Sequence, residues 1–174
     1  VWKAIDPEDD YGDSVEKEFG TEDQAVGAFF ADQARDYYLD DRDDDAIACY
    51  RRAVDILEES AEPGDIMYPK LIDSIQTLGH IHCYRRGDSE AAIAFYRRVV
   101  DMLEKTATPG DDLYPELVDS IQKLADIHYL EDEFDEAEPF YRKALEMLTK
   151  SGKQGTDEYA ELEDSIEDVA ERRL

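Results

Sequence analysis

The sequence predicts an all-α repeat protein built from stacked antiparallel helix hairpins, and two recurring phrases carry this prediction. Tyr-Arg-Arg at 50–52 returns at 96–98 and, with Lys as its last residue, at 141–143, so the steps are 46 and then 45 residues. The phrase Asp-Ser-Ile-Gln keeps this spacing and stands, ending in Glu in its last copy, at 73–76, 119–122 and 164–167. Self-similarity with a period of about 20–50 residues is typical of stacked repeats. We therefore expect an alpha-solenoid of three repeats, each 45–46 residues long, and a C-terminal capping helix.

Length and charge set the first limits on function. The chain has 174 residues, enough for one domain with a substantial buried core. Its 46 acidic and 19 basic residues give a formal net charge of -27. Such a field repels nucleic-acid phosphates and anionic lipid, so we expect a basic protein partner rather than nucleic acid or a membrane. Solubility, or adaptation to a salt-rich cell, would favour the same composition and stays open as an alternative.

The cysteines and the apolar residues indicate the compartment. Cys49 and Cys83 stand at different places in their repeats and form no CxxC pair, so a disulfide scaffold is not expected. No apolar run approaches the roughly 18 residues that a membrane span needs. The first residues are acidic and lack the apolar segment of a signal peptide. We therefore expect a cytoplasmic protein in a reducing compartment.

Two regions are expected along the chain. Residues 1–20 form an acidic N-terminal arm that Pro and Gly interrupt, and Trp2 and Phe19 are its apolar anchors, for the first repeat or for a partner. Residues 21–174 form the helical repeat domain. The division follows the point at which the apolar residues begin to recur at helical spacing.

The first repeat is predicted from a helix start signal and an apolar stripe. Thr21 and Gln24 fit a capping box, in which the hydroxyl and the amide each satisfy a free backbone N–H group. A helix is expected over 22–39, with an inward face formed by Ala25, Phe29, Phe30, Ala34 and Tyr37. Residues 40–45 are expected to form a turn, and Ala46 to open a second helix that ends near Ser60.

The later repeats show the same pattern more clearly. Pro-Gly-Asp at 63–65 and 109–111 predicts a helix end, because Gly accepts positive φ and Pro cannot continue the helix. Tyr-Pro at 68–69 and 114–115 then opens each first helix, where the missing N–H of Pro costs nothing. The inward residues of these first helices are expected to be Leu71, Ile75, Leu78, Gly79 and His82, and Leu117, Ile121, Leu124, Ala125 and His128. Those of the second helices are Ala46, Tyr50, Ala53 and Leu57, then Ala92, Tyr96, Val99 and Leu103, then Ala137, Tyr141, Ala144 and Leu148.

Two local features complete the prediction. The extra residue behind the step of 46 is assigned to the turn at 86–88. The last helix is expected over 157–174, with an inward face formed by Leu162, Ile166, Val169 and Ala170. Its other face is charged, as the terminal helix of a stacked repeat needs to be for solubility.

These positions resemble the tetratricopeptide repeat over residues 21–174. The shared pattern is a small residue at two helix crossings, here 79 or 125 and 92 or 137, and an aromatic residue within the second helix. The long unit and the phrase EAEPFYRKALEM at 136–147 are similar to the kinesin light chain-like subgroup. The resemblance implies first helices that line a concave groove, and a noncatalytic protein-interaction module.

Two ligand classes of the family do not fit this sequence. Kinesin light chains hold peptide backbone with an Asn pair, and the matching positions here are Gln76-Thr77, Gln122-Lys123 and Glu167-Asp168. Recognition of cargo motifs in that way is not expected. Other members grip acidic chaperone tails with Lys and Asn, but only Arg35 and Lys123 are cationic at the corresponding positions.

Helical spacing selects candidate groove residues on the first helices. These are Arg35, Asp73, Gln76, Thr77, His80, Asp119, Gln122, Lys123 and Asp126. Carboxylates and amides at intervals would suit a basic or mixed-polarity segment, whose charges meet the Asp residues and whose backbone meets the Gln residues. The alternative is that Asp73 and Asp119 only favour the first turns of their helices through the helix dipole.

No catalytic, metal or cofactor site is expected. His80 and His82 project about 200 degrees apart on a helix, and His82 matches His128 in the next repeat, which favours packing over metal binding. The basic pairs that follow each second-helix Tyr are expected to pair with carboxylates. The predicted function is a noncatalytic interaction scaffold with a peptide groove. A structural subunit that docks through its ends, its convex face or its arm is the alternative.

Overall fold

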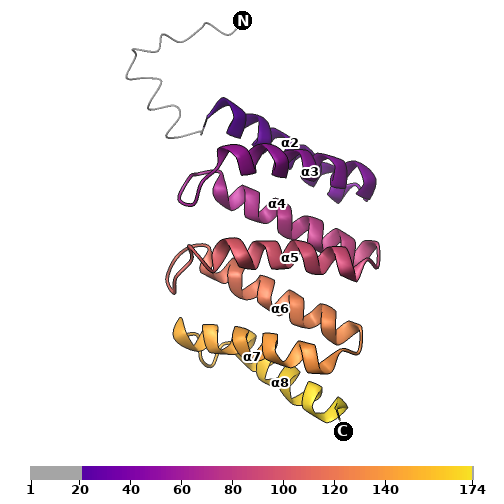
Figure 1. Cartoon of the computed structure of the whole chain (residues 1–174), viewed down its shortest axis with the longest axis vertical. Coiled ribbons are helices and arrows are strands. Elements are labelled where there is room, and N and C mark those ends of the chain that lie inside the picture. Colours follow the sequence, from indigo (N-terminus) through magenta and orange to yellow (C-terminus); the bar gives the residue numbers. More distant parts are fainter. Residues whose placement is uncertain (1–20, 174) are drawn as a thin grey trace, which may run out of the picture. The chain divides into compact units, whose positions relative to one another are not determined.

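The computed structural model describes residues 21–173, which fold into helices and connecting turns without a strand (Figure 1). The predicted acidic arm, residues 1–20, lies outside the described residues. The described chain divides into two compact units, one up to Ser74 and one from Ile75 onward. A single repeat domain over 21–174 therefore stays a prediction, and each unit is described by itself.

The first unit consists of one helix hairpin and the start of the next helix. Helices α2 (Glu22–Leu39) and α3 (Asp43–Ser60) pack on each other, and the first turns of α4 (Tyr68–His80) follow. The predicted bounds of α2 and its capping box are confirmed, since Gln24 N–H donates to Thr21 Oγ1 and Thr21 N–H donates to Gln24 Oε1. The predicted start of α3 at Ala46 is wrong by three residues. Three Asp residues form its first turn, where the helix dipole stabilises carboxylates.

The inward face of α2 differs from the predicted apolar stripe. The helix buries Gly27, Ala28, Ala31 and Ala34, whereas the side chain of Phe29 is 62% exposed. Of the predicted stripe, only Ala34 is buried; Ala25 is exposed, and Phe30 and Tyr37 are half-buried. The reason is close approach of α3, because a Cβ atom at Gly27 would lie 2.7 Å from Leu57 Cγ. Only small residues fit against a helix at that distance.

The Pro-Gly-Asp turns end the helices as predicted. Gly64 and Gly110 adopt φ values of 100° and 105°, in the left-handed region that glycine tolerates. Asp65 Oδ2 accepts from the Glu62 N–H at 2.8 Å, and the second turn repeats this bond from Thr108 to Asp111 at 2.6 Å. In the first unit, the buried Gln24 amide also donates to the Ser60 carbonyl and to Asp65. Gln24, the second residue of the capping box, therefore also holds α2 to the end of α3.

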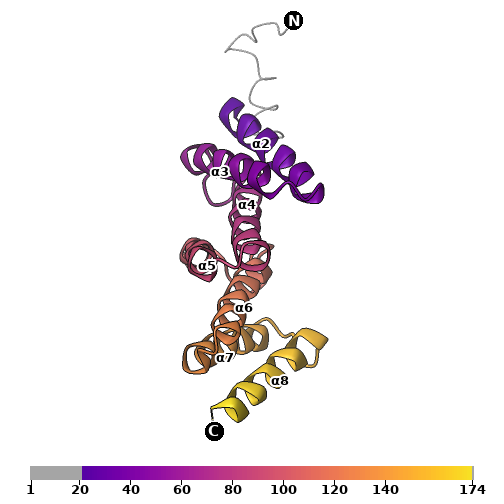
Figure 2. The ribbon, with the colours of Figure 1, turned by 90° about the vertical axis from the view of Figure 1, so that its right-hand side faces the viewer.

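The second unit continues from the end of α4 through five further elements (Figure 2). These are η1 (Ile81–Arg85), α5 (Ser89–Leu103), α6 (Tyr114–Leu130), α7 (Phe134–Lys150) and α8 (Asp157–Arg172). Each packs on its neighbour in sequence: α5 on η1 and α6, α6 on α7, and α7 on α8. Such nearest-neighbour packing is the hallmark of a repeat architecture.

The predicted core positions of the second unit are confirmed on α5, α6 and α7. All the stripe residues predicted for these helices are buried. The small residue at 79 allows close packing, because a Cβ there would lie 3.0 Å from the Tyr96 ring. On α8, Leu162 and Val169 are buried, but Ile166 is half-buried and Ala170 is exposed. Among the described elements α8 has its main contact with α7 alone, so it buries a narrower stripe than predicted.

The structure corrects the position of the extra residue. Residues Ile81–Arg85 form a π-helical turn, closed by a bond from the Arg86 N–H to the carbonyl five residues earlier, at 3.1 Å. At the same place in α6, Glu131 donates to the carbonyl four residues earlier. The turns that follow are alike, because Gly87 and Asp132 share a left-handed backbone with φ of 64° and 59°. The helix end, not the turn, therefore absorbs the insertion.

The packing role predicted for the two equivalent histidines is confirmed. His128 Nδ1 lies 2.7 Å from Glu133 Oε2, and its ring stacks on Phe140 with the ring centroids 5.6 Å apart. His82 makes the same two contacts, with Asp88 at 3.2 Å and with the Phe95 ring at 5.4 Å. Each histidine thus joins a first helix to the second helix of the same hairpin.

Candidate functional site

The first unit contains an open cleft between α2 and the start of α4. Its volume is about 320 Å³, and its lining residues are Ala31, Asp32, Arg35, Ile66, Pro69, Lys70 and Asp73. The predicted groove residues Arg35 and Asp73 therefore lie in one cleft. The lining combines two cations and two carboxylates with apolar side chains, a composition suited to a peptide side chain of mixed character.

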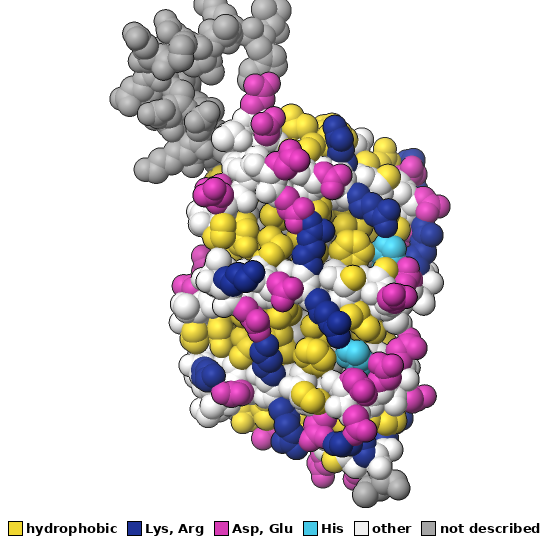
Figure 3. All heavy atoms as spheres, in the orientation of Figure 1, with side chains coloured by type: hydrophobic (Ala, Val, Ile, Leu, Met, Phe, Trp, Pro, Cys, Tyr) yellow, Lys and Arg dark blue, Asp and Glu magenta, His cyan; other side chains and the backbone are white. Residues whose placement is uncertain are grey.

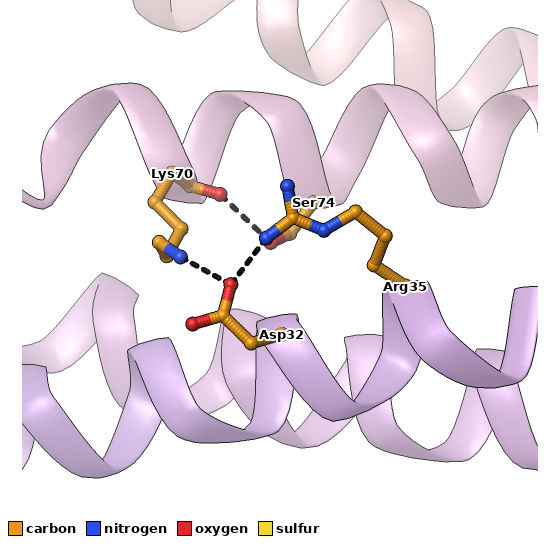
Figure 4. Close-up of polar contacts among 4 residues, drawn as sticks. All are labelled: Asp32, Arg35, Lys70 and Ser74. Carbon is orange, nitrogen blue, oxygen red and sulfur yellow. Dashed lines mark hydrogen bonds and ion pairs between the residues drawn. The ribbon is translucent and has the colours of Figure 1, made fainter.

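Two cations converge on one carboxylate in this cleft (Figure 4). Asp32 Oδ1 lies 2.5 Å from Arg35 Nη2 and 2.6 Å from Lys70 Nζ. The hydrogen bond from Lys70 is the main cause of the lowered pKa of Asp32, and Arg35 contributes to it. The Ser74 hydroxyl donates to the Lys70 carbonyl at 2.7 Å and lies within the same group (Figure 4).

Lys70 lines this cleft but is absent from the groove residues predicted from the sequence. Its equivalent in the next repeat is Glu116, so the repeats offer no shared cation at this place. The available signal was the spacing of Lys70 and Asp73, since residues three apart share a helix face. Asp73 is exposed, yet burial raises the pKa of its carboxyl group while Arg35 and Lys70 lower it. A carboxylate that is both exposed and partly desolvated lies in a recess rather than on an open surface.

In the second unit, α6 presents a polar face built around Lys123. Lys123 Nζ lies 3.3 Å from Asp126 Oδ2, and the Tyr141 hydroxyl donates to Asp126 Oδ1 at 2.9 Å. Both oxygens of the Asp126 carboxylate therefore have a partner within the fold. Of the predicted groove residues, Asp126 is the one that holds α6 to α7.

Asp119 lies on the same helix and differs from Asp126. Its side chain is exposed and forms no hydrogen bond or ion pair with any residue in the described range 21–173. Burial nevertheless raises the pKa of its carboxyl group; Lys123 lowers it, and Glu116, Asp126 and Glu158 raise it. The negative neighbours outnumber the single cation. Asp119 is thus a recessed carboxylate without a partner in an acidic environment, which favours a cationic ligand.

The two predicted groove glutamines have different roles. Gln76 Nε2 donates to the Ser120 hydroxyl at 3.0 Å and to the Glu116 carbonyl at 3.3 Å, so its amide joins α4 to α6. Gln122 is half-buried and makes no hydrogen bond to another described residue. Only Gln122 therefore keeps its whole amide for a peptide backbone.

The remaining predicted residues lie at the end of α4, next to an aromatic residue that was not predicted. Thr77 and His80 are half-buried there. The rings of His80 and Tyr84 have centroids 4.8 Å apart, and Tyr84 is 48% exposed. Burial, Lys123 and Arg85 lower the pKa of His80. In the sequence, only the step of 46 residues pointed to this place, because the inserted residue lies in the same helical turn as Tyr84.

Over residues 21–173, no group of three His, Cys, Asp or Glu side chains is placed to hold a metal ion. Within the same range no helix is both long and apolar enough to cross a membrane.

The basic pair on the second helix of the third repeat pairs with carboxylates. Arg142 lies 2.7 Å from Glu138, and Lys143 pairs with Glu104. Arg51 and Arg52 form no such pair with a described residue. On the face shown in Figure 3, Lys and Arg side chains lie among acidic side chains and apolar patches. The prediction of ion pairing is confirmed at Arg142 and Lys143.

Helix hairpins that recur every 45–46 residues and bury small residues at their crossings define an all-α repeat protein of the alpha-solenoid class. The family model of the tetratricopeptide repeat matches residues 72–104 and 118–147. In these two segments the chain is similar to the tetratricopeptide repeat, as the resemblance predicted.

Solved structures show the same fold. The crystal structure of BtubC (BKLC) from P. vanneervenii has a TM-score of 0.71 and 15% identity, and the match covers 88% of this chain and 58% of that one. A structure of kinesin light chain-like, nearly identical TPR-like repeats from Podosopora anserina has a TM-score of 0.68 and 14% identity, with 92% and 73% covered. A single-substitution variant of the latter gives 0.69. The kinesin light chain-like resemblance is thus confirmed for the fold, and no curated protein matches the chain.

Proposed function

We propose that this chain is a noncatalytic scaffold whose first helices bind a basic or mixed-polarity peptide segment of a partner protein. Tetratricopeptide repeats generally mediate protein–protein interactions, and two segments of this chain match their family model. The observation that carries the specific proposal is Asp119, a recessed carboxylate without a partner among the described residues. A Lys or Arg side chain would supply the missing charge.

The rest of the polar face supports the same ligand. The free amide of Gln122 lies one helical turn from Asp119 and can bond a peptide backbone. In the first unit, Arg35 and Lys70 share one Asp32 oxygen, so an acidic side chain of the ligand would find two cations there. This cleft, which also contains Asp73, by itself favours a segment with both charge signs. The free thiols of Cys49 and Cys83 support a cytoplasmic location, which belongs to this proposal.

The proposal is tested by titrating the full chain with an acetylated octapeptide of alternating Gly and Arg, at low and at high salt. We expect binding that weakens with salt, because exposed charges are screened. Asp119→Lys and Asp73→Lys should each weaken binding by about five- to tenfold. The controls are Asp101→Lys on α5 and Asp55→Lys on α3, which change the net charge equally at exposed second-helix positions.

Two further measurements complete this test. Binding should fall on acidification at a pH above the usual range of an Asp, because burial raises the pKa of Asp119 and its protonated form attracts no cation. Octapeptides of Gly with Ser, and of Gly with Glu, should not bind. Equal binding of all three peptides, or equal effects of the Asp119 and Asp101 variants, would contradict the proposal.

A structural subunit that docks through its ends is the second candidate. The observation in its favour is the exposed apolar side of α2, where Phe29 and Leu39 are 62% and 71% exposed. Under this alternative, Phe29→Ser would release the partner in affinity purification, whereas Asp119→Lys would leave it bound. The opposite pattern would support the peptide site.

A further inference from the structure

We propose that Asp32 occupies, in the free protein, the place that a carboxylate of the partner takes in the complex, and that Arg35 is the cation that exchanges one for the other. The proposal rests on the proposed function and describes how the cleft of the first unit accepts an acidic side chain of the peptide. Both cations of the cleft, Arg35 and Lys70, are already bound to one oxygen of Asp32. A ligand carboxylate can therefore reach them only by exchange.

The two cations hold Asp32 unequally. Lys70 reaches Asp32 from α4, and its side chain is 28% exposed. Arg35 reaches it from the same helix, three residues further on, and its side chain is 59% exposed. Among the causes that lower the pKa of Asp32, the hydrogen bond from Lys70 is the largest and that from Arg35 the smallest. Because ion pairs between exposed side chains are weak, Arg35 is the cation that can leave Asp32, whereas Lys70 stays.

The geometry of the guanidinium group favours the exchange. Arg35 donates to Asp32 through Nη2 at 2.5 Å (Figure 4). A guanidinium group has five N–H donors, and its strongest pairs with carboxylates are bidentate. A carboxylate of the partner is not attached to α2, so it can approach Arg35 in the plane that allows two parallel hydrogen bonds. The exchange thus replaces a bond from one nitrogen by a bidentate pair.

The second unit contains an ion pair of the same spacing that is held more firmly. Lys123 Nζ lies 3.3 Å from Asp126 Oδ2, three residues away on α6. The other oxygen of this carboxylate accepts from the Tyr141 hydroxyl of α7 at 2.9 Å. Both side chains of the pair are about half as exposed as those of Arg35 and Asp32. Exchange is therefore expected in the cleft of the first unit and not at this pair.

The rest of the lining fits a glutamate side chain. Two cations and two carboxylates line the cleft, so their formal charges cancel and the lining does not repel a further carboxylate. Ile66 and Pro69 add apolar surface on which the methylene groups of a glutamate can pack. The ligand group is therefore an acidic side chain with an aliphatic stem.

The test measures how much a ligand carboxylate contributes to binding. Two octapeptides, acetylated and amidated, are titrated against the full chain by calorimetry: Gly-Arg-Gly-Glu-Gly-Arg-Gly-Glu, and the same peptide with Gln for Glu. Gln keeps the shape of Glu without its charge. The dissociation constant of the Gln peptide divided by that of the Glu peptide therefore isolates the carboxylate.

Two variants should move this ratio in opposite directions. Arg35→Gln removes the cation that the ligand carboxylate needs, so it should lower the ratio about three- to fivefold, the size expected for an exposed ion pair. Asp32→Asn removes the internal carboxylate and releases Arg35, so it should raise the ratio by a similar factor. A pair between Asp32 and Arg35 with a purely structural role would give no such increase. Thermal melts confirm that both variants remain folded.

Asp36→Asn and Arg52→Gln are the matched controls, because each removes the same charge at an exposed position of the first unit outside the cleft. Each should change the ratio less than twofold. An unchanged ratio in Asp32→Asn, an equal rise in Asp36→Asn, or failure of both mixed peptides to bind overturns the exchange. If the Gly–Arg octapeptide then still binds and Asp119→Lys still weakens it, the basic-peptide function stands without the exchange. If no basic peptide binds, both are wrong.

Discussion

Helices α2 and α6 are both first helices of their hairpins, but they pack in different ways. The buried face of α6 consists of large side chains, among them Leu117, Ile121 and Leu124. Apart from the capping residue Gln24, the buried face of α2 consists of glycine and alanine, and its large side chain Phe29 is exposed to solvent. The comparison teaches that one hairpin can be stabilised by large apolar side chains and another by close approach of the two backbones.

The largest difference is expected from truncating a large side chain on each helix. Leu124→Ala should destabilise the protein by about 2–5 kcal/mol, because it leaves a cavity in the core of the second unit. Phe29→Ala should cost less than about 1 kcal/mol, since the ring is mostly hydrated already. Urea unfolding followed by circular dichroism measures both. A cost at Phe29 equal to that at Leu124 would mean that the ring is covered in solution.

The second prediction concerns the smallest residues. Gly27→Ala should destabilise the protein by about 1–2 kcal/mol, since overpacking against Leu57 outweighs the roughly 1 kcal/mol gain in helix propensity. At Gly79 a new Cβ would meet the Tyr96 ring at 3.0 Å, which needs a smaller shift, so Gly79→Ala should be nearly neutral. Thermal melting of the two variants gives the comparison. Stabilisation by Gly27→Ala would show that α2 and α3 are not closely packed.

The smallest effect is expected at the two glutamines. Gln76→Ala should cost about 1 kcal/mol, because it removes the hydrogen bonds to Ser120 and to the Glu116 carbonyl. Gln122→Ala should change stability by less than about 0.5 kcal/mol and should weaken peptide binding instead. Chemical denaturation and peptide titration of the same two variants separate the roles. Equal losses of stability in the two variants would mean that both amides make hydrogen bonds within the fold.

Much of the fold could be predicted because the same residue pattern recurs in each repeat. The helix ends at the Pro-Gly-Asp turns, the capping box at Thr21 and the buried stripe of α6 follow from local chemistry that recurs or has a defined geometry. The face of α2 could not be predicted by hydrophobicity, because the distance between α2 and α3 selects Gly27 over Phe29. The spacing of apolar residues along the sequence does not indicate the distance between two packed helices.

The candidate site was predictable only in part. Helical spacing placed Arg35 and Asp73 on the cleft and Asp119 on the polar face of α6. It could not show which polar groups the fold itself uses, because Asp126 is held by a tyrosine from another helix. It also missed Tyr84, whose position depends on how the chain accommodates one inserted residue.

The π-helical turn at Ile81–Arg85 has a consequence for how such a protein can evolve. An insertion in a packed helix usually rotates every later side chain away from its partner. Here both histidine contacts and both left-handed turns survive a one-residue difference in length. The end of α4 is therefore a place where a lineage can gain, lose or exchange a surface side chain while the inherited core stays in register.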